Sequence, residues 1–381
     1  MRLPRTRDRF FGAAWYSLAV GWVIAGSGCI IDLNGLTTPG AGGNAGASGE
    51  GGGGTTSGTG APGGGGTGGG ECTLLDCCPE GQVIEVAKGS TLAGLPRDIV
   101  VGPGGVIWVN MDGDNMVRMP ASGGPAEVLV QTPSPRGLAV VDNTAVWTAQ
   151  DGVHTCSLAD CAGSNTLVAA VTTMGSVTAV AFDGSTVLYS DLGSGAGDGK
   201  VFSCQLGNCN PITLGSNLID PGGVALYGLQ AFWTDRGDGN DNGTVARSPK
   251  NVDNYSQVSA ALNLPTHVIG NEEYVYWTEQ VPNGQVVRCP IAGGYCDSPE
   301  PLAPNGGPFN RPGDIVFGAG RVYWVNQDDG TIVSCPEQGC GADLPKVHVS
   351  GRTGLARLVI GDSCLFWTEN GGGGAVFKTA R

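Results

Sequence analysis

Short runs that alternate between apolar and polar residues recur along the chain, and a clear pair of them lies within Tyr274–Gly294. The run YVYWTE ends at a polar turn that contains Asn283 and Gly284, and a second run, QVVRC, leads to a Gly-Gly corner. Alternating runs rich in Val, Tyr and Trp on either side of an Asn-Gly turn are typical of a β-hairpin. The sequence therefore predicts two antiparallel strands in this segment.

The same hairpin pattern repeats, and each repeat carries one aromatic anchor in its second strand. A repeat of about 40–50 residues with one aromatic residue per unit is the mark of a four-stranded propeller blade. No segment shows the sustained 3.6-residue period of a helical repeat. We therefore predict an all-β fold, a seven-bladed β-propeller with four antiparallel strands per blade. The seven anchors are Trp108, Trp147, Tyr189, Trp233, Trp277, Trp324 and Trp367.

The first strand of each unit is predicted to be the innermost strand of its blade. Nine residues before every anchor stands a bulky apolar residue, and a smaller apolar residue follows it. A strand that is apolar on both faces is buried on both faces, as a strand between two neighbouring blades must be. The residues ten before the anchors, where these strands begin, are Asp98, Gly137, Ala179, Gly223, His267, Asp314 and Arg357.

The propeller is expected to span residues 72–381 and to be closed by its own N-terminal segment. Cys72–Cys77 followed by Gln82–Ala87 reads like Cys156–Cys161 and the run after it, which form the outer part of the second unit. The seventh unit ends in a third strand, AVFKTAR, with no fourth strand after it. We therefore expect the N-terminal segment to pair with the last blade, which would remove an open sheet edge.

Residues 1–28 are predicted to be a targeting segment. Four arginines precede an apolar stretch, Phe10–Ala25, and Ser27-Gly28 stand before Cys29. This pattern resembles a bacterial lipoprotein signal and implies lipid attachment at Cys29, although Gly26 stands where that signal usually has an aliphatic residue. An ordinary cleaved signal peptide and a short transmembrane anchor are the alternatives. All three would export the rest of the chain.

Residues 29–71 are predicted to be a disordered tether. From Gly35 to Gly70 the chain is almost entirely Gly, Thr, Ser, Ala and Pro, so it has no apolar groups to bury. A flexible coil of this length has a root-mean-square reach of roughly 30–35 Å. We expect an extracytoplasmic propeller that is lipid-anchored to the bacterial cell envelope, at the outer membrane or the cell surface.

The 13 cysteines support this location. Without Cys29 an even number remains, which in an exported chain favours disulfides. Zinc is the alternative, but pairs on the outer edges of different blades cannot converge on one four-ligand site. Cys78 and Cys364 are left over and would either bond each other or stay as free thiols. The other predicted disulfides are Cys72–Cys77, Cys156–Cys161, Cys204–Cys209, Cys289–Cys296 and Cys335–Cys340.

The charge distribution suggests a ligand site on one face. With 34 acidic and 20 basic side chains, the chain is a poor partner for nucleic acid. Acidic residues gather in the loops after the second strands, on the face where Asp98, His267, Asp314 and Arg357 begin the inner strands. That face holds the channel mouth, the default ligand site. Alternatively, the acids are ordinary turn residues and His267 is a solvated turn residue.

One loop has the beginning of a calcium motif. Asp238, Asn240 and Asn242 place oxygen ligands at alternate positions before Gly243, but Pro249 stands where the motif has its strongest acidic ligand. Calcium at these three residues is the only cofactor that the sequence suggests.

The repeated phrase resembles the YWTD repeats of low-density-lipoprotein-receptor-type propellers, here in a bacterial secreted lipoprotein. The phrases are Phe232–Asp235, Tyr276–Glu279, Tyr323–Asn326 and Phe366–Glu369. The receptor propellers have six blades, whereas this chain has seven repeats. In that family the terminal acid of the motif ties strands and blades together. The resemblance therefore implies a structural role for Asp235, Glu279 and Glu369, and recognition rather than chemistry.

Three functions are compatible with these features. The first is a monomeric, non-catalytic binding or scaffold propeller that recognises a protein or glycan at an acidic channel mouth, with no catalytic residue. The second is a propeller enzyme of the lyase or lactonase type, in which Asp98, His267 and Asp314 would hold a divalent metal, although Arg357 would repel it. No Gly-x-Ser-x-Gly, His-Glu-x-x-His or phosphate-loop motif is present. The third is an envelope protein without a ligand.

Overall fold

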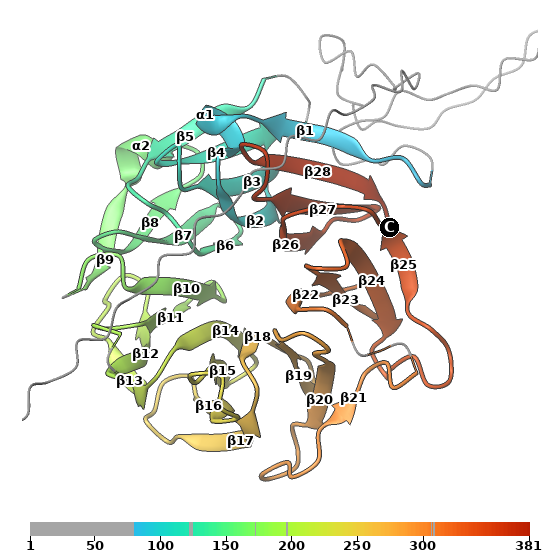
Figure 1. Cartoon of the computed structure of the whole chain (residues 1–381). Coiled ribbons are helices and arrows are strands. Elements are labelled where there is room, and N and C mark those ends of the chain that lie inside the picture. The colour runs from blue at the N-terminus through green and yellow to red at the C-terminus, as the bar shows by residue number, and fades with distance from the viewer. Residues whose placement is uncertain (1–79, 122–124, 172, 196, 306, 308) are drawn as a thin grey trace, which may run out of the picture. The chain divides into compact units, whose positions relative to one another are not determined.

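Seven four-stranded antiparallel sheets form a ring in the computed structural model of the chain (Figure 1). The structure describes residues 80–381 except 122–124, 172, 196, 306 and 308. In this part of the chain, 28 strands are accompanied by two four-residue helices, α1 (Ser90–Ala93) and α2 (Cys161–Ser164). The predicted seven-bladed β-propeller is confirmed. The predicted targeting segment, Cys29 and the tether lie outside the described residues.

Blades 1 to 6 follow the chain, each running from its innermost to its outermost strand. Blades 1 and 2 are β2 (Pro96–Gly102), β3 (Gly105–Asn110), β4 (Asn115–Pro120) and β5 (Glu127–Gln131), then β6 (Leu138–Val141), β7 (Thr144–Ala149), β8 (Gly152–Ser157) and β9 (Thr166–Ala170). Blades 3 and 4 are β10 (Val177–Phe182), β11 (Thr186–Asp191), β12 (Gly199–Gln205) and β13 (Ile212–Leu218), then β14 (Pro221–Tyr227), β15 (Gln230–Asp235), β16 (Gly243–Pro249) and β17 (Ser256–Leu262). Blades 5 and 6 are β18 (Pro265–Gly270), β19 (Tyr274–Glu279), β20 (Val286–Pro290) and β21 (Glu300–Pro301), then β22 (Pro312–Gly318), β23 (Arg321–Asn326), β24 (Thr331–Pro336) and β25 (Lys346–Val349).

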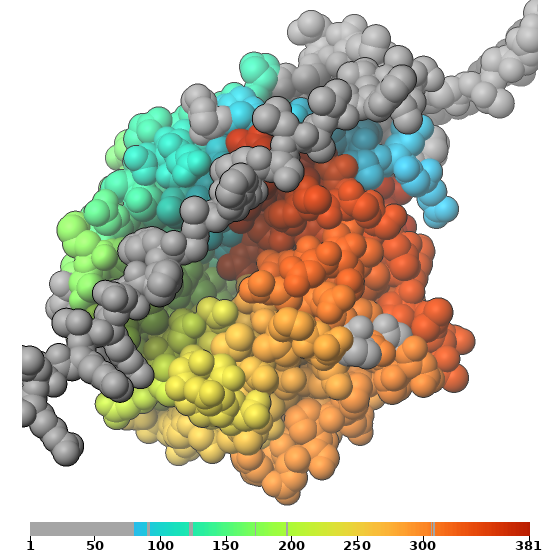
Figure 2. All heavy atoms as spheres, viewed as in Figure 1, coloured from blue at the N-terminus to red at the C-terminus, as the bar shows by residue number. Residues whose placement is uncertain are grey.

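Blade 7 combines strands from both ends of the described chain. Its order from the outside is β1 (Ile84–Lys88), β28 (Ala375–Ala380), β27 (Cys364–Glu369) and β26 (Leu355–Ile360). β1 lies antiparallel to β28, and the hydroxyl of Thr379 donates to the carbonyl of Gln82 at 2.7 Å. In the space-filling view, blue atoms of the N-terminal segment lie against the red atoms of this blade (Figure 2). The predicted ring closure is therefore confirmed.

The apolar core is divided among the interfaces between blades. Seven clusters of buried side chains are found in the described part of the chain, one for each pair of neighbouring blades. Each cluster contains one of the seven aromatic anchors. The six tryptophan anchors are fully buried and Tyr189 is 3% exposed. Burial of each such side chain stabilises the fold by about 2–3 kcal/mol, so the repeated aromatic residue holds each blade against the one before it.

Four disulfides have both cysteines within the described residues, and they are four of the pairs that the spacing predicted: Cys156–Cys161, Cys204–Cys209, Cys289–Cys296 and Cys335–Cys340. Each connects the end of a third strand to the segment that follows it. Cys364 is also disulfide-bonded, while Cys72, Cys77 and Cys78 of the other predicted pairs lie outside the described residues. Structural disulfides persist in oxidising compartments, which indicates an extracytoplasmic protein. Within the described ranges, no helix has the length and apolar character to cross a bilayer.

The joint between α1 and blade 7 gives a first prediction. Gly374 stands just before β28 with φ +77°, and a Cβ at this position would overlap the backbone of Ala93 and Gly94. Gly372 also has a positive φ, +63°, but a Cβ there would meet nothing. We expect Gly374→Ala to lower the free energy of unfolding by at least about 2 kcal/mol more than Gly372→Ala, because only the first adds a backbone clash to the strain of a positive φ. Urea unfolding of the two variants measures the difference, and equal midpoints would contradict the close approach at this joint.

Candidate functional site

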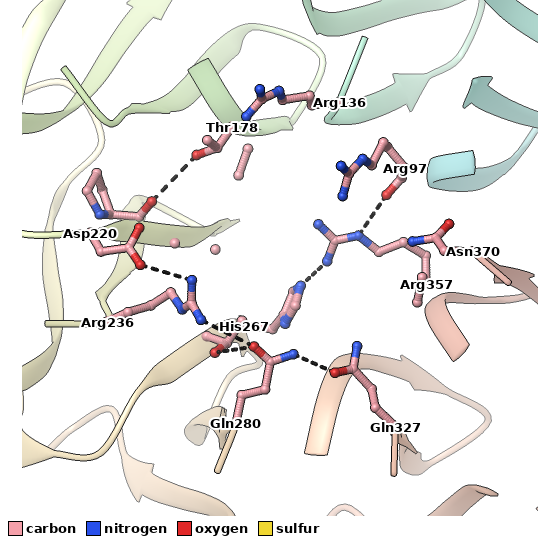
Figure 3. Close-up of a pocket in the computed structure, with 16 residues that line it drawn as sticks. Arg97, Arg136, Thr178, Asp220, Arg236, His267, Gln280, Gln327, Arg357 and Asn370 are labelled. Carbon is pink, nitrogen blue, oxygen red and sulfur yellow. Dashed lines mark hydrogen bonds and ion pairs between the residues drawn. The ribbon is translucent and has the colours of Figure 1, made fainter. Parts of the chain in front are cut away.

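A cavity of about 330 Å³ lies at one end of the central channel (Figure 3). Its walls come from two places in the repeat, the start of the inner strands and the residues that directly follow the second strands. Thr178, Thr266 and Arg357 belong to the first group, and Gln280 and Asn370 to the second. This is the channel mouth that the sequence indicated as the ligand face.

The structure brings the four predicted site residues together below this mouth. The Arg357 guanidinium lies 3.4 Å from Asp314 Oδ1 and 3.9 Å from Asp98 Oδ1. Its Nη1 also contacts His267 Nε2, and His267 Nε2 is 3.8 Å from Asp314 Oδ1. A second cavity of about 170 Å³ is lined by all four. His267 and Arg357 also line the mouth cavity, so they form its floor.

The two aspartates tie neighbouring blades together. Asp98 Oδ2 accepts a hydrogen bond from the backbone N–H of Leu138 at 2.9 Å, and Asp314 Oδ2 accepts one from Leu358 at 2.8 Å. Each bond runs from one inner strand to the inner strand of the next blade. The two carboxylates therefore have a structural role, the connection of neighbouring blades, that does not depend on a ligand.

Blades 3 and 4, which lack this aspartate, use a hydroxyl directly after the anchor. The hydroxyls of Ser190 and Thr234 donate to carbonyl oxygens of the next blade's inner strand, both at 3.1 Å. Blades 1 and 6, which carry the aspartates, have Val109 and Val325 at the position after the anchor. Blades 1 and 6 are thus tied to the next blade by a carboxylate, and blades 3 and 4 by a hydroxyl.

Burial and the Arg357 charge control the ionisation of this cluster. Burial raises the pKa of Asp98 to about 6, although Arg357 and the backbone N–H groups act against the rise. Burial also raises the pKa of Asp314. The pKa of His267 is well below its ordinary value, first because of burial and then because of Arg357 and Arg236. His267 is therefore a neutral imidazole at pH 7. Because its Nε2 faces the Arg357 donor, we assign the ring hydrogen to Nδ1, which is buried without a partner.

Three arginines of the mouth were missed by the sequence reasoning. Arg97 and Arg136 stand one residue before the ring of inner-strand residues in blades 1 and 2, and Arg236 follows the second strand of blade 4. With Arg357 they give the mouth four guanidinium groups and one carboxylate, Asp220. The expectation of an acidic mouth is therefore wrong. The sequence does contain a signal for two of these arginines. Arg97 and Arg136 each stand eleven residues before an anchor, and the two anchors are consecutive.

These arginines differ in how their charge is balanced. Arg236 Nη1 pairs with Asp220 Oδ2 at 2.9 Å. The Arg97 side chain reaches only Met111 Sδ, at 3.3 Å. Arg136 makes no side-chain hydrogen bond or ion pair with the described residues, and its Nε is buried without a partner. Burial lowers the pKa of Arg97, the charges of Arg136 and Arg357 lower it further, and the carboxylate of Asp112 acts in the opposite direction. Arg97 and Arg136 therefore repel each other, and neither guanidinium forms an ion pair with a carboxylate of the described residues.

The acids that suggested an acidic mouth are used within turns and strand ends. Asp235 accepts from the backbone N–H groups of Ile219, Asp220 and Gly237. Glu369 accepts from the indole of Trp367 at 2.8 Å and pairs with Arg352 at 2.6 Å. These contacts support the structural role that the YWTD resemblance implied for Asp235 and Glu369.

The candidate calcium loop is closed on itself. Asp238 Oδ1 accepts from the backbone and side-chain amides of Asn240, at 3.1 and 2.9 Å. Asn242 Oδ1 accepts from the backbone N–H of Asp238 at 3.0 Å. Among the described residues, no group of three or more His, Cys, Asp or Glu side chains is placed to hold a metal. Calcium at this loop stays a prediction from the sequence alone.

Solved structures with the same fold include enzymes and designed proteins. No protein-family model and no curated protein matches the chain. A streptogramin B lyase is similar with a TM-score of 0.61 and 13% identity, over 78% of this chain and 96% of the lyase. The computationally designed protein Ika8 is similar with a TM-score of 0.55 and 15% identity, over 78% and 99%. Regucalcin, a calcium-binding protein from Agrobacterium tumefaciens, aligns with a TM-score of 0.46 and 13% identity, over 77% and 93%. At these identities the first two similarities concern the fold alone, and the seven sheets of this chain make it a seven-bladed β-propeller.

Proposed function

We propose that this protein is an exported, membrane-tethered propeller that binds an anionic ligand at its channel mouth without catalysing a reaction on it. The observation that carries the proposal is the Arg97–Arg136 pair. Two partly buried guanidinium groups from adjacent blades face one cavity, and neither forms an ion pair with a carboxylate of the described residues. Holding unpaired charges away from water costs free energy, and a bound anion would offset that cost.

The geometry of the pair suits a carboxylate, sulfate or phosphate group. Arginine presents a planar fork of donors, which binds such anions through two parallel hydrogen bonds. Figure 3 shows both guanidinium groups among the side chains that line the cavity. A volume of about 330 Å³ is in the range of small-molecule sites, about 300–1,000 Å³. The ligand is therefore a small molecule or the end group of a larger one.

The floor of the mouth supports binding rather than metal-assisted chemistry. Asp98 and Asp314 are occupied by backbone N–H groups of the next blade and by Arg357. Four arginines around the mouth would repel a divalent cation. The similarity to a streptogramin B lyase concerns the fold alone and adds nothing to the alternative of an enzyme.

The proposed location depends on the disulfides and the N-terminal sequence. Four disulfides support export. The apolar segment that ends at Cys29, followed by a Gly-rich stretch, supports a lipid anchor with a tether. The ligand would then meet the propeller outside the cytoplasm.

Replacing both unpaired arginines tests the proposal. We expect sulfate and acetate, added at constant ionic strength, to raise the melting temperature of the wild-type protein in a saturable way. Arg97→Gln with Arg136→Gln should weaken this binding at least about tenfold, because each charged hydrogen bond contributes about 1.5–3 kcal/mol. Arg118→Gln is the matched control, since Arg118 pairs with Glu127 on the outer strands of blade 1.

Two outcomes would overturn the proposal. One is the absence of saturable anion binding to the wild-type protein. The other is equal affinity in the wild-type protein and the double variant, which would place the anion somewhere else.

A further inference from the structure

We infer that the ligand of the mouth is an acidic sugar, a polyol with one carboxylate that binds Arg97 and Arg136 while its hydroxyls meet the opposite wall. This inference rests on the proposed function and narrows it. Its basis is the difference between the two sides of the cavity (Figure 3).

The wall opposite Arg97 and Arg136 is a chain of hydrogen-bonding side chains from blades 4 to 6. Asp220 accepts from Arg236 at 2.9 Å, and Arg236 Nη2 donates to Gln280 Oε1 at 3.4 Å. Gln280 Nε2 in turn donates to Gln327 Oε1 at 2.8 Å. Each side chain is held by its neighbour, so the wall presents donors and acceptors at fixed places.

This wall is polar but has no net charge. Asp220 and Arg236 neutralise each other, and Gln280 and Gln327 are uncharged. A ligand with a second anionic group would have to compete with the Asp220 carboxylate for Arg236 there. The cavity therefore suits one anionic group on the side of Arg97 and Arg136 and neutral groups on the other side.

Hydroxyl groups match the neutral side. A hydroxyl both donates and accepts, and this wall offers both kinds of partner. Asp220 Oδ1 is an acceptor, and Gln327 Nε2 is a donor, and neither makes a hydrogen bond within the described part of the chain. The residues that line the mouth include no Phe, Tyr or Trp. A saturated ring or an open-chain polyol needs no aromatic ring to stack on, and its hydroxyls are met by the side chains of this wall.

Four probes separate the contributions of the two walls. These are acetate for the anion alone, D-glucose for the hydroxyls alone, D-glucuronate for both, and inorganic phosphate for a compact anion of higher charge. Calorimetric titration of the full-length protein at pH 7.5 and low ionic strength gives the affinities. We expect glucuronate to bind at least about tenfold more tightly than acetate or phosphate, and glucose to bind more weakly than either, because only glucuronate uses both walls.

Variants then assign the two parts of the ligand. Gln327→Leu should reduce the ratio of glucuronate to acetate affinity from at least about tenfold to less than about threefold. Gln205→Leu is the matched control and should keep the ratio, because Gln205 bonds Thr186 and Asn251 rather than lining the mouth. The Arg97→Gln/Arg136→Gln variant should lose binding of both glucuronate and acetate.

Failure of the inference differs from failure of the proposed function. If acetate, phosphate and glucuronate bind equally and all depend on Arg97 and Arg136, the mouth binds anions but not acidic sugars, and the inference is overturned. If no probe depends on the two arginines, both the inference and the proposed function are overturned.

A hyaluronan tetrasaccharide that ends in glucuronate shows whether the acidic sugar is free or is the end of a polysaccharide. Tighter binding than free glucuronate supports the end of a polysaccharide, and weaker binding supports a free sugar acid.

Discussion

A chain that lacks Cys72–Lys88 is expected to melt about 8 °C below the full-length protein. The deletion removes β1, so the backbone of β28 becomes an open edge. It also removes Ala87, which is 7% exposed and packs in the cluster between blades 7 and 1. Loss of several strand hydrogen bonds, at about 1 kcal/mol each, and of buried apolar surface amounts to about 5 kcal/mol. With an unfolding entropy of about 2.1 cal/mol/K per residue, this corresponds to roughly 8 °C for a domain of about 300 residues.

The control for this deletion removes the Gly-rich stretch and keeps β1. A chain without Gly35–Gly70 should melt at the temperature of the full-length protein, because this segment has no apolar side chains to add to the core. Differential scanning calorimetry of the three chains measures the effect. A deletion of Cys72–Lys88 that melts with the control would show that β1 adds nothing to the ring.

Arg357→Met is expected to destabilise the propeller by about 3–5 kcal/mol at pH 8. Arg357 begins the inner strand of blade 7 and contacts Asp98 of blade 1, His267 of blade 5 and Asp314 of blade 6. Without its charge the two buried carboxylates have no cation beside them. Removing one partner of a buried ion pair costs this much because the other charge stays buried and unpaired.

The cost should depend on pH in a defined direction. Burial already raises the pKa of Asp98 to about 6, above the value of about 3.9 in an unfolded chain. The folded state therefore binds this proton more tightly, and the associated stability is present below about pH 4 and lost as the pH rises to about 6. In Arg357→Met the pKa values of Asp98 and Asp314 should rise further, so this loss should extend to higher pH. The stability difference from the wild-type protein should be smaller at pH 5 than at pH 8.

Arg247→Met is a matched control for the pH dependence. Arg247 also joins two blades, but its guanidinium donates to the backbone carbonyls of Ile291 and Gly293 and to no carboxylate. Its loss should give a stability difference that stays constant from pH 5 to pH 8. Adding Asp98→Asn and Asp314→Asn to Arg357→Met should recover part of the stability at pH 8. Urea unfolding of these variants at the two pH values measures the effects, and a pH-independent cost for Arg357→Met would show that the carboxylates do not depend on it.

The fold was predictable because each repeat carries its own signal. An aromatic anchor that fills the space between two blades must recur once per blade, so Trp108 and its six equivalents count the blades directly. The incomplete seventh repeat and the extra strand before the first repeat predicted the closure by β1. The short disulfide loops were visible from their spacing, because both cysteines lie at the same outer corner of a blade.

The site was predictable only in part. A fixed distance from each anchor identifies the residues of the inner ring, and this rule brought Asp98, His267, Asp314 and Arg357 together correctly. The charge of the mouth was not predictable from the number of acids near it, because Asp235 and Glu369 point their oxygens at backbone and indole N–H groups. Which arginines lack a partner depends on contacts between blades, and no pattern within one repeat records those contacts.

The bond between Thr379 and Gln82 joins residues that are 297 positions apart. During synthesis the strand that contains Ile84 is made before every blade, and its partner is made after all the others. The strand that contains Ile84 therefore stays unpaired while six blades assemble. Pairing between strands so far apart in the sequence is slow. An unpaired strand can recruit a neighbouring molecule, so the newly made chain is most vulnerable to aggregation and to proteases in the interval before its first strand meets its last.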